Sequence, residues 1–500
     1  MREPLEIIVV GGGTAGWMSA VALANATNDQ ICKITLVESE EIGSVGVGEA
    51  TLPQIKEFND RVGINESDMM KFTQATFKLG IEFVNWGRLG ASYIHPFGKH
   101  GEAIQGNEFH QIWGRVRSQE GIADIGAYSY AIEAGRKHRF DFPVSDGNYI
   151  NSTYSYAYHF DASLYALFLR QEALKQGVRR IEGKILNVKK HAVSGNIESL
   201  TLASGKEISG DFFVDCSGLR SLLLAQELGE EFEDWSPWLL CDRAWALPTS
   251  KLEDIPPYTR STAKAAGWQW RIPLQHRTGN GYVFSSQFST EQSALDSLEQ
   301  SINEQAIADA RLIKFKAGRY KNSWTKNCVA IGLSSGFLEP LESTSIYLIQ
   351  VAIQNLLKLF PSKQSNSLAI QEYNRLMDNE YARIRDFLIL HYKLNDGSLG
   401  DFWQHCKNME IPKSLAEKLE IFKRRGFVDT YNYGLFSLPS WVSVFIGQGW
   451  FQEGFDPFAL GLADEDITLQ LNKLSTKINI KLADTPTHQA FINQYCAAKA

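Results

Sequence analysis

The sequence lacks three features that would place it in common classes of protein. No uninterrupted apolar run approaches the roughly 18 residues of a membrane span. No basic stretch has the form of a nucleic-acid footprint, and the net charge is -7. The ten histidines show no zinc-like spacing, and no CxxC pair occurs. We therefore expect no membrane span, no nucleic-acid partner and no metal site.

Cysteine is sparse and scattered, with six residues in 500. In a chain of this length such spacing favours reduced, buried thiols and a cytoplasmic protein. The opening MREPLEIIVVGGGTAG is not typical of a signal peptide, because Arg2, Glu3 and Glu6 flank an apolar run that ends at Val10. The basic triplet at 423–425 is better interpreted as a solvated helix end than as a binding patch.

The chain is long enough for one large domain with an extension, or for two to three domains. Hydrophobic residues make up 44% and aromatics 12%, which is sufficient for a sizeable core. We find no repeats and no low-complexity segments. We predict a core over residues 1–360, with substrate-binding insertions at about 60–180 and 230–320. Residues 361–500 are predicted to be mainly helical and to complete the substrate pocket.

The first 50 residues predict a strand, a glycine-rich turn, a helix and a second strand. GGGTAG fits GxGxxG through Gly11, Gly13 and Gly16, and Glu38 closes the next strand. Glycines allow close approach of a pyrophosphate, the helix N-terminus faces its charge, and Glu38 can accept from ribose hydroxyls. This context predicts a dinucleotide site without deciding between FAD and NAD.

Two later segments favour FAD. VGVGEATLP (Val45–Pro53) is a second glycine-rich loop of a kind that can lie along a flavin. DFFVDCSGLRSLL (Asp211–Leu224) predicts a strand ending in a small-residue turn, which can return to the adenine end. Each is also compatible with an ordinary loop of a large α/β protein.

GWQWRIP at 267–273 predicts an extended strand with two indoles on one face, because side chains two apart share a face. Trp268 and Trp270 would form a wall, and Pro273 would end the strand. The alternative is plain packing of a strand face.

Two charged residues lie in apolar surroundings. Lys78, in FKLGIEFVNW, either reaches solvent along its stem or is held inside for a reason. Glu342 precedes an apolar helix predicted from about Ser343 to Phe360, with Ser343 or Thr344 as its cap. The buried N-terminus of that helix could hold a small anion such as a halide, or Glu342 could be a simple capping-region acid.

These motifs together resemble one family. GWQWRIP matches WxWxIP, the signature of flavin-dependent halogenases of the tryptophan halogenase type, over a resemblance that runs from residue 5 to about 360 and more loosely to the end. Further matching blocks, in the family's order, are GGGTAG, VGVGEATLP, FKLGIEFVNW, HPFG (His95–Gly98) and GFLEPLESTSI (Gly336–Ile346). GxGxxG is shared with many flavoproteins, whereas the tryptophan, lysine and EPLEST blocks together are highly specific.

The resemblance implies an α/β fold: a doubly wound FAD-binding core of the flavin monooxygenase, hydroxybenzoate hydroxylase-like type, an inserted β-rich substrate domain and a helical C-terminal part. It implies that reduced FAD from a separate flavin reductase, oxygen and chloride or bromide yield hypohalous acid. The acid would pass to Lys78, which presents the halogen to an aromatic ring. Glu342 would stabilise the cationic ring or help to remove its proton. A homodimer is also compatible with the resemblance.

The resemblance also assigns the remaining site residues. Thr344 and Ser345 would bind the halide, and Trp268 and Trp270 would keep the organic substrate away from the flavin. Substrate-binding residues would be His95, Phe97, Ser343 and Trp450, with His95 and Phe97 stacking on the ring. The expected FAD contacts are Gly11, Gly13, Thr14, Ala15, Gly16, Glu38, Gly48, Ala50, Val188, Leu333 and Ile346.

The sequence departs from family members that act on free tryptophan in two places. Ser345 stands where they usually have glycine, which leaves the halide preference open. Their C-terminal lid has no clear counterpart in residues 430–455, although Trp441, Trp450 and Phe451 could line an aromatic pocket. Indole, a substituted indole or another electron-rich ring is therefore at least as good a candidate as tryptophan.

Three rival functions remain at this stage. An FAD-dependent hydroxylase usually carries Gly-Asp after its late strand, where this sequence has Leu333. A reductase of isoprenoid chains would have no use for Lys78. A catalytically idle FAD-binding scaffold would not need both Lys78 and Glu342.

Overall fold

The computed structural model describes residues 3–42, 48–364, 366–429 and 434–498. The described residues divide into two compact units, each built from separate stretches of the chain. Unit 1 comprises Met1–Ala75, Phe160–Pro237 and Lys314–Ala382, and unit 2 comprises Thr76–His159, Trp238–Ile313 and Arg383–Ala500.

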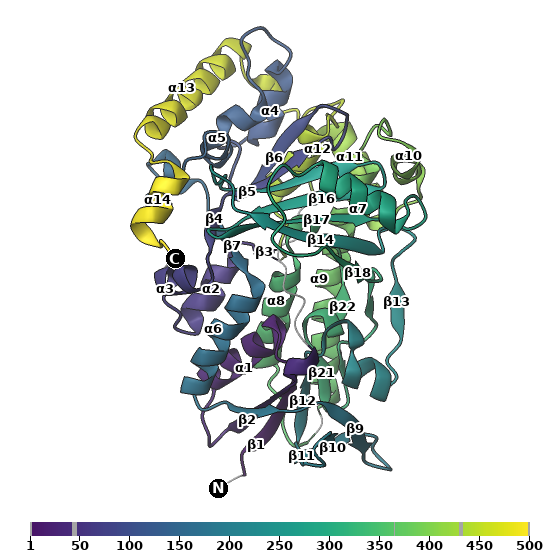
Figure 1. The fold of residues 1–500 in the computed structure, drawn as a ribbon. Helices are drawn as coiled ribbons and strands as arrows, with labels where there is room; N and C mark the ends of the chain where they lie inside the picture. Colours follow the sequence, from purple (N-terminus) through teal and green to yellow (C-terminus); the bar gives the residue numbers. More distant parts are fainter. Residues whose placement is uncertain (1–2, 43–47, 365, 430–433, 499–500) are drawn as a thin grey trace. The chain divides into compact units, whose positions relative to one another are not determined.

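Unit 1 opens with the predicted βαβ motif (Figure 1). Strand β1 (Leu5–Val10) and strand β2 (Cys32–Glu38) are parallel, with Ile7 beside Ile34, and helix α1 (Thr14–Ala26) connects them. The alternating small and apolar residues of α1 are buried from Gly16 to Leu23. The sequence prediction for this segment is confirmed.

The sheet that contains β1 has the order β20-β21-β12-β1-β2-β8. Neighbouring strands in it are parallel except β20 and β21, as is typical of a doubly wound core. The other strands are β8 (Arg179–Glu182), β12 (Phe212–Asp215), β20 (Trp324–Thr325) and β21 (Cys328–Ala330). The predicted α/β core is confirmed.

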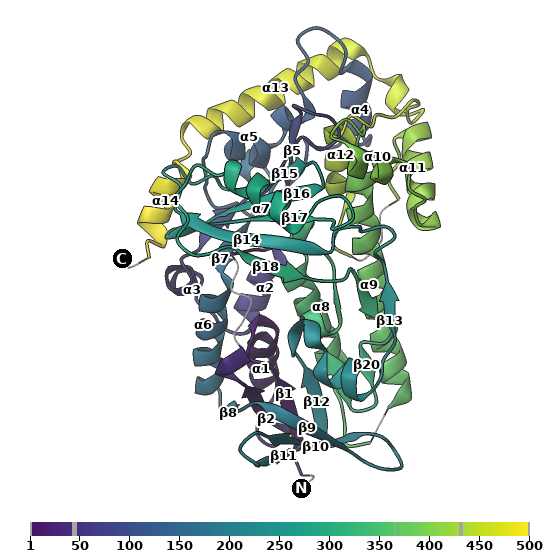
Figure 2. The same cartoon turned by 45° about the vertical axis from the view of Figure 1, so that its right-hand side comes forward.

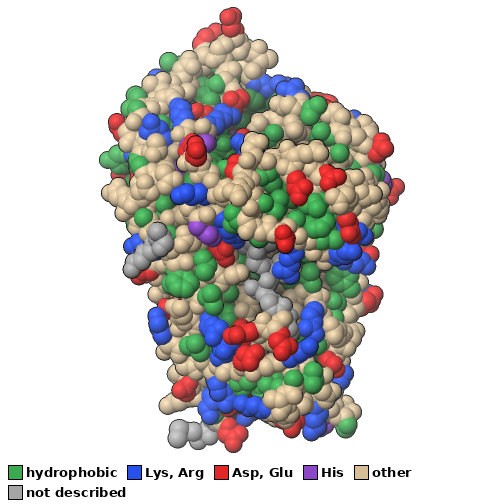
Figure 3. Space-filling view, viewed as in Figure 1, with side chains coloured by type: hydrophobic (Ala, Val, Ile, Leu, Met, Phe, Trp, Pro, Cys, Tyr) green, Lys and Arg blue, Asp and Glu red, His purple; other side chains and the backbone are tan. Residues whose placement is uncertain are grey.

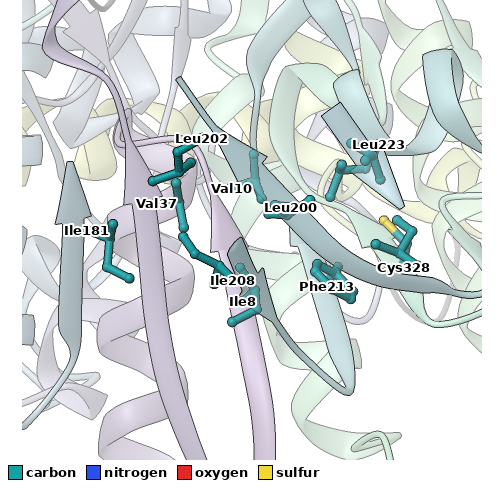
Figure 4. Packing of buried hydrophobic residues seen from close by; sticks show 12 residues of the cluster. Ile8, Val10, Val37, Ile181, Leu200, Leu202, Ile208, Phe213, Leu223 and Cys328 are labelled. Carbon is teal, nitrogen blue, oxygen red and sulfur yellow. The ribbon is translucent and has the colours of Figure 1, made fainter. Parts of the chain in front are cut away.

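A smaller antiparallel sheet, β11-β10-β9, packs against this core (Figure 4). Ile8 of β1 and Phe213 of β12 meet Leu200 and Ile208 of the smaller sheet in one buried cluster. Each such side chain contributes about 1.5–3 kcal/mol on full burial. The strands are β9 (Ile185–Lys190), β10 (Ile197–Leu202) and β11 (Glu207–Ser209).

The remaining elements of unit 1 are mostly helices. Helix α8 is buried along nearly its whole length, as its apolar sequence predicts. These elements are β3 (Gly48–Ala50), α2 (Gln54–Arg61), α3 (Glu66–Phe72), α6 (Ala162–Lys175), a π-helix (Leu222–Glu227), β13 (Phe232–Asp234), β19 (Gly318–Tyr320), β22 (Gly336–Phe337) and α8 (Ser345–Lys358).

Unit 2 is built on a sheet with the order β18-β14-β17-β16-β15-β5-β6. Strands β14 to β17 pair antiparallel, and β15 pairs parallel with β5. The strands are β5 (Gly80–Val84), β6 (Ser92–Pro96), β14 (Arg243–Ser250), β15 (Thr259–Lys264), β16 (Gly267–Pro273), β17 (Arg277–Phe284) and β18 (Arg311–Lys314).

One face of this sheet is covered by helix α7 (Glu291–Gln300), which lies against β14 and β17 (Figure 2). Tyr282 and Phe284 point to that face and pack with Leu298 of α7. Because side chains alternate along a strand, Trp268 and Trp270 point to the opposite face. We call this opposite side the tryptophan face.

The strand register places further residues on the tryptophan face. Ser261 lies opposite Trp270, and Thr259, two residues before it, lies beside Ile81. His95 lies opposite Ile81 on the next strand. The same face therefore runs from the two indoles across three strands to His95.

Gly281 makes room for one of the indoles. It lies opposite Trp270 on β17, and a Cβ at this position would come within 2.1 Å of the Trp270 ring. The indole therefore occupies the space that any larger residue at 281 would fill.

The rest of unit 2 is predominantly helical, as predicted for the C-terminal part of the chain. Helix α11 ends in the basic triplet, which confirms its interpretation as a helix end. Among the described residues, the six cysteines are buried and free, and no helix is long and apolar enough to cross a membrane. The elements are β4 (Thr76–Lys78), β7 (Ala157–Asp161), α4 (Phe109–Val116), α5 (Tyr130–Arg136), α9 (Ser367–Lys393, shared with unit 1), α10 (Asp401–Asn408), α11 (Lys413–Arg425), α12 (Leu438–Gly447), α13 (Asp464–Ala483) and α14 (His488–Tyr495).

Buried histidines make the stability of the fold depend on pH. Burial lowers the pKa of His100 to about 3 and that of His488 to about 4, and it also lowers the pKa of His110 and His159. In the unfolded chain these groups take up protons near pH 6.5. Their contribution to stability is therefore complete above about pH 6.5 and is lost as the pH falls. Glu49, whose pKa burial raises to about 7, acts in the opposite direction as a single group.

We expect the free energy of unfolding to fall between pH 7 and pH 5. Removing one titrating group in His488→Gln should reduce that slope by about 1 kcal/mol per pH unit. Denaturant titrations at three pH values measure both slopes. Equal slopes for the variant and the parent protein would show that His488 does not stay neutral in the folded state.

Candidate active site

The glycine-rich turn after β1 is compact. Gly11 has φ +115°, and a Cβ on it would lie 2.2 Å from the carbonyl oxygen of Cys216. A Cβ on Gly16 would lie 1.8 Å from the carbonyl oxygen of Gly11. These two glycines are therefore required by packing within the protein.

Gly13 differs from the other glycines of the turn. A Cβ there would meet nothing within 4 Å, and the residue is the N-cap of α1, without a hydrogen bond from a capping side chain. Thr14 and Ala15, which follow it, are half-buried. The turn thus offers open space in front of the free N–H groups and partial positive charge of a helix N-terminus. These residues fit the pyrophosphate of a dinucleotide.

Glu38 ends β2, as predicted, and its carboxylate lies against the turn. A Cβ on Gly12 would come within 1.5 Å of Glu38 Oε2, so the middle glycine is needed for this approach. Sequence reasoning did not assign this role to Gly12. Glu38 Oε1 accepts a hydrogen bond from Arg180 Nε at 2.5 Å and lies 3.6 Å from Arg170. Contact with a ribose remains a prediction.

The loop after β21 lies next to the start of α1. Gly332 has φ +78°, and a Cβ on it would lie 2.9 Å from the Cβ of Ala15. Leu333 follows in the 3-10 helix Gly332–Ser334 and is half-buried. The structure therefore brings the predicted cofactor residues Ala15 and Leu333 into one neighbourhood.

Asp215, at the end of β12, is a buried residue that sequence reasoning missed. Its carboxylate accepts from the backbone N–H groups of Leu223 and Leu224 at 2.7 and 2.9 Å and from that of Ser217 at 3.0 Å. Burial raises its pKa in spite of these bonds. Asp215 thus organises the turn that the sequence predicted at 211–224.

The other predicted FAD contacts are more dispersed. Gly48 and Ala50 form the ends of β3, and Ala50 is buried, while the preceding residues 45–47 lie outside the described residues. Ile346 is buried in the first turn of α8. Val188 lies in β9 within the buried cluster of Figure 4 and faces Leu200 across the sheet, as a core residue does. Contact of these residues with FAD stays a prediction.

The segment before α8 contains the predicted cap position but not a capping side-chain bond. The helix begins at Ser345, and Thr344 is its N-cap residue without donating or accepting a capping side-chain bond. Ser343 has φ 60° and so lies in the left-handed region, outside the helix. The Thr344 hydroxyl therefore makes no capping bond to the helix. The left-handed residue turns the chain between the short 3-10 helix Pro340–Glu342 and α8.

This arrangement leaves polar groups at a buried helix start. Thr344 Oγ1 is buried and finds no hydrogen-bond partner among the described residues, and Ser345 is half-buried. Glu342 is fully buried two residues before Thr344. Buried polar groups without partners are rare in native proteins and call for an explanation. A small anion at this helix N-terminus would provide one.

Lys78 lies in unit 2, on strand β4, and is fully buried. The alternative in which its ammonium reaches solvent is therefore wrong. Its Nζ lies 5.0 Å from the centroid of the Phe97 ring, a favourable position for a cation. The structure thus brings the predicted residues Lys78 and Phe97 together.

The two tryptophans lie side by side on one face of the sheet, as their spacing predicts, and their role as a barrier stays a prediction. Trp268 and Trp270 are 1% and 8% exposed, and their ring centroids are 6.3 Å apart. The indole N–H of Trp268 is buried and has no hydrogen-bond partner in the described part of the chain. Packing alone would favour an apolar ring at such a position.

His95 lies in an aromatic cluster that sequence reasoning did not find. Its ring centroid is 5.9 Å from that of Phe387 and 6.4 Å from that of Phe436, and these two phenylalanines stack at 3.8 Å. Trp441 meets Phe387 edge-on at 5.1 Å. No sequence motif marks Phe387, which lies within the long helix α9.

Trp450 has a different environment. It is half-buried, and Lys423 Nζ lies 5.9 Å from its ring centroid. Its predicted place against the substrate therefore stays a prediction, and Thr430–Tyr433 lie outside the described residues.

A cavity of about 720 Å³ lies in unit 2, and none of the predicted site residues is among the described residues that line it. Its lining includes Gln111 of α4, Val428, and Leu438 at the start of α12, two residues after Phe436. The exposed ring of Phe458 also borders it. Its volume lies within the range of small-molecule pockets, about 300–1,000 Å³.

On the face shown in Figure 3, basic and acidic side chains are interspersed. Within the described ranges, no group of three or more histidine, cysteine, aspartate or glutamate side chains could hold a metal ion.

Known proteins are similar to this chain in sequence and in fold. The sequence profile of the family named tryptophan halogenase matches residues 6–464. The flavin-dependent halogenase Xcc4156 of Xanthomonas campestris is 42% identical, with a TM-score of 0.96 and 100% of both chains covered. The flavin-dependent halogenase BrvH of Brevundimonas sp. BAL3 is 40% identical, with a TM-score of 0.94 over 98% of this chain and 99% of its own.

The same relationship extends to curated sequences. Tryptophan 6-halogenase SttH of Streptomyces toxytricini is 36% identical over 490 residues, which cover 93% of this chain and 92% of SttH. The fold and these likenesses define a flavin-dependent halogenating enzyme. The chain belongs to the tryptophan halogenase family.

The glycine turn provides a test of cofactor binding. Gly13→Ala should fold normally, because its Cβ meets no atom within 4 Å, but should weaken FAD binding by about tenfold or more where the pyrophosphate approaches. Fluorescence titration with FAD measures the affinity, and thermal unfolding without FAD measures stability. Gly16→Ala is the contrast, because its Cβ would overlap Gly11 and should destabilise the protein itself. Unchanged FAD affinity in Gly13→Ala would show that the pyrophosphate does not bind at this turn.

Proposed function

We propose that this enzyme forms hypohalous acid from chloride or bromide and delivers the halogen through Lys78 to an electron-rich aromatic ring. The observation that carries the proposal is the fully buried Lys78 ammonium beside Phe97, in the unit that also carries the two tryptophans and His95. Burying a lysine side chain costs free energy, and a role in catalysis would explain why it is kept at this position. Bound FAD would supply the oxidising chemistry, and Gly13, Ala15 and Glu38 are the residues proposed to hold it.

Lys78 would orient the oxidant. Its ammonium can donate hydrogen bonds to hypohalous acid, or its amine can carry the halogen, and either arrangement presents the halogen from one direction. Phe97 and His95 would hold the ring by stacking. Glu342 would balance positive charge on the ring or accept its proton, and that charge exists only near the transition state.

The halide is proposed to bind at the start of α8. The N–H groups of Thr344 and Ser345, the buried Thr344 hydroxyl and the helix dipole support an anion there. Ser343 is proposed to take part in substrate binding.

The substrate is proposed to be indole, an indole derivative or tryptophan. The name of SttH specifies tryptophan as its substrate, and that of the relative KtzR specifies 7-chloro-L-tryptophan. We further propose that a separate flavin reductase supplies reduced FAD in the cytoplasm, without a stable complex, and that the enzyme can form a homodimer.

One assay tests the proposal. The protein is given FAD, a flavin reductase, NADH, and either bromide or chloride, together with indole, tryptophan and a panel of phenols and indoles. Mass spectrometry should show a halogen isotope pattern that Lys78→Ala lowers by about a hundredfold or more. A gain of oxygen instead, independent of halide and of Lys78, would favour the hydroxylase.

The same assay tests the tryptophan wall. If Trp268 and Trp270 separate the substrate from the flavin, Trp268→Phe and Trp270→Phe should form oxygenated product beside the halogenated one. Stable variants that form only halogenated product would reduce the pair to core packing.

A further inference from the structure

The strand that carries Lys78 is held by a histidine that none of the family motifs includes. Strand β4 pairs antiparallel with β7, so that Thr76 lies opposite His159 and Lys78 lies opposite Ala157. Side chains two apart share a face, and His159 is therefore a diagonal neighbour of Lys78 on the same face. Thr76 and His159 are both fully buried.

Both ring nitrogens of His159 lie within hydrogen-bond distance of threonine hydroxyls. Nδ1 is 2.9 Å from Thr76 Oγ1, and Nε2 is 3.0 Å from Thr259 Oγ1. Thr76 Oγ1 also donates to the carbonyl oxygen of Pro273 at 2.7 Å. Pro273 is the last residue of the strand that carries the two tryptophans.

The number of protons fixes the direction of these bonds. A threonine hydroxyl has one proton, and that of Thr76 is donated to Pro273. Thr76 must therefore accept from His159 Nδ1–H. A neutral imidazole carries one N–H, so Nε2 accepts from the Thr259 hydroxyl. The chain of bonds runs from Thr259 to His159, then to Thr76, and ends at Pro273.

The chain requires an uncharged ring. Burial, and then the nearby Lys78, lower the pKa of His159 well below its usual value of 6.5. A protonated ring would place a second positive charge beside Lys78, and its Nε2 could no longer accept from Thr259. The neutral state thus satisfies both threonines and adds no positive charge beside Lys78.

We infer that His159 is a positioning residue for Lys78, because its one-directional chain of hydrogen bonds clamps β4 to Thr259 on the tryptophan face and to Pro273 at the end of the tryptophan strand. The chain joins strands β15, β7, β4 and β16 within unit 2, two residues from Lys78. The inference rests on the proposed delivery of the halogen by Lys78. Its consequence is that loss of the clamp should let hypohalous acid escape without slowing its formation.

The test uses the full chain with FAD, flavin reductase, NADH, bromide and indole. His159→Phe keeps a ring of similar size but removes both hydrogen bonds, whereas His159→Gln offers one donor and one acceptor. Thr259→Val removes only the donor to Nε2 and serves as a milder variant if His159→Phe folds poorly. Leu298→Ala, on the α7 face of the same sheet, is the control for lost stability.

Three quantities are measured for each variant: brominated product, hypobromous acid captured by a 1,3-diketone trap, and melting temperature. The ratio of product to trapped acid should fall by about tenfold in His159→Phe, as expected for a displaced transfer group, and by less in Thr259→Val. His159→Gln should recover most of the ratio. Leu298→Ala should lower the melting temperature while the ratio stays at that of the parent protein.

Two results would overturn the inference. One is a parental ratio in both His159→Phe and Thr259→Val, and the other is an equal fall of the ratio in Leu298→Ala. Lys78→Ala, included in the same series, separates the two proposals. Full bromination by Lys78→Ala would contradict delivery by Lys78 itself, whereas its loss together with a parental ratio in the His159 variants would contradict only the clamp.

Discussion

A lysine side chain with no exposure to solvent, that of Lys78, is the constraint on which the proposed active site depends. Removing a cation from water costs several kcal/mol unless its surroundings compensate. The surroundings of Lys78 supply the face of the Phe97 ring and a neighbouring histidine that stays uncharged. Strand β4, which carries the lysine, is held by hydrogen bonds from both its backbone and its side chains. Phe77 N–H, for example, donates to His488 Nε2 at 3.1 Å.

The sheet of unit 2 gathers several of the predicted site residues on one face. Its register places Trp268, Trp270, Thr259 and His95 on one face, and α7 closes the other. Residues from strands far apart in the sequence thus lie on the same face of one sheet. In unit 1 the glycine turn and the start of α8 present two helix N-termini, each suited to negative charge. Anionic groups are therefore expected at the helix N-termini of unit 1, and the aromatic ring of the proposed substrate is expected at the sheet of unit 2.

Much of this could be read from the sequence, and the reason is local. GGGTAG and WxWxIP act through residues that are neighbours in the chain, so spacing alone predicts the turn and the paired indoles. Of the two residues predicted as the cap of α8, Thr344 holds that position, whereas Ser343 takes a left-handed conformation that a serine adopts only rarely. The spacing of the motif does not predict the need for glycine at position 12, because that need comes from the Glu38 carboxylate, which lies where a Cβ would be.

The residues that sequence reasoning missed depend on long-range pairing. His159 is 83 residues from Thr76 and 100 from Thr259, and Thr76 is 197 from Pro273. Each is an unremarkable residue on its own strand, and only the register brings them together. Phe387 and Phe436 reach His95 in the same way, from a long helix and a loop.

The most direct measurement of the central claim, that Lys78 presents the halogen from one direction, is the distribution of regioisomers. The substrate should be one that the enzyme accepts and that free hypobromous acid brominates at more than one carbon. NMR of the products would compare the enzyme with the free acid under the same conditions. The account predicts one dominant isomer from the enzyme, in a proportion that the free acid does not reach. Identical distributions would mean that the acid reacts in solution and that the buried lysine does not guide it.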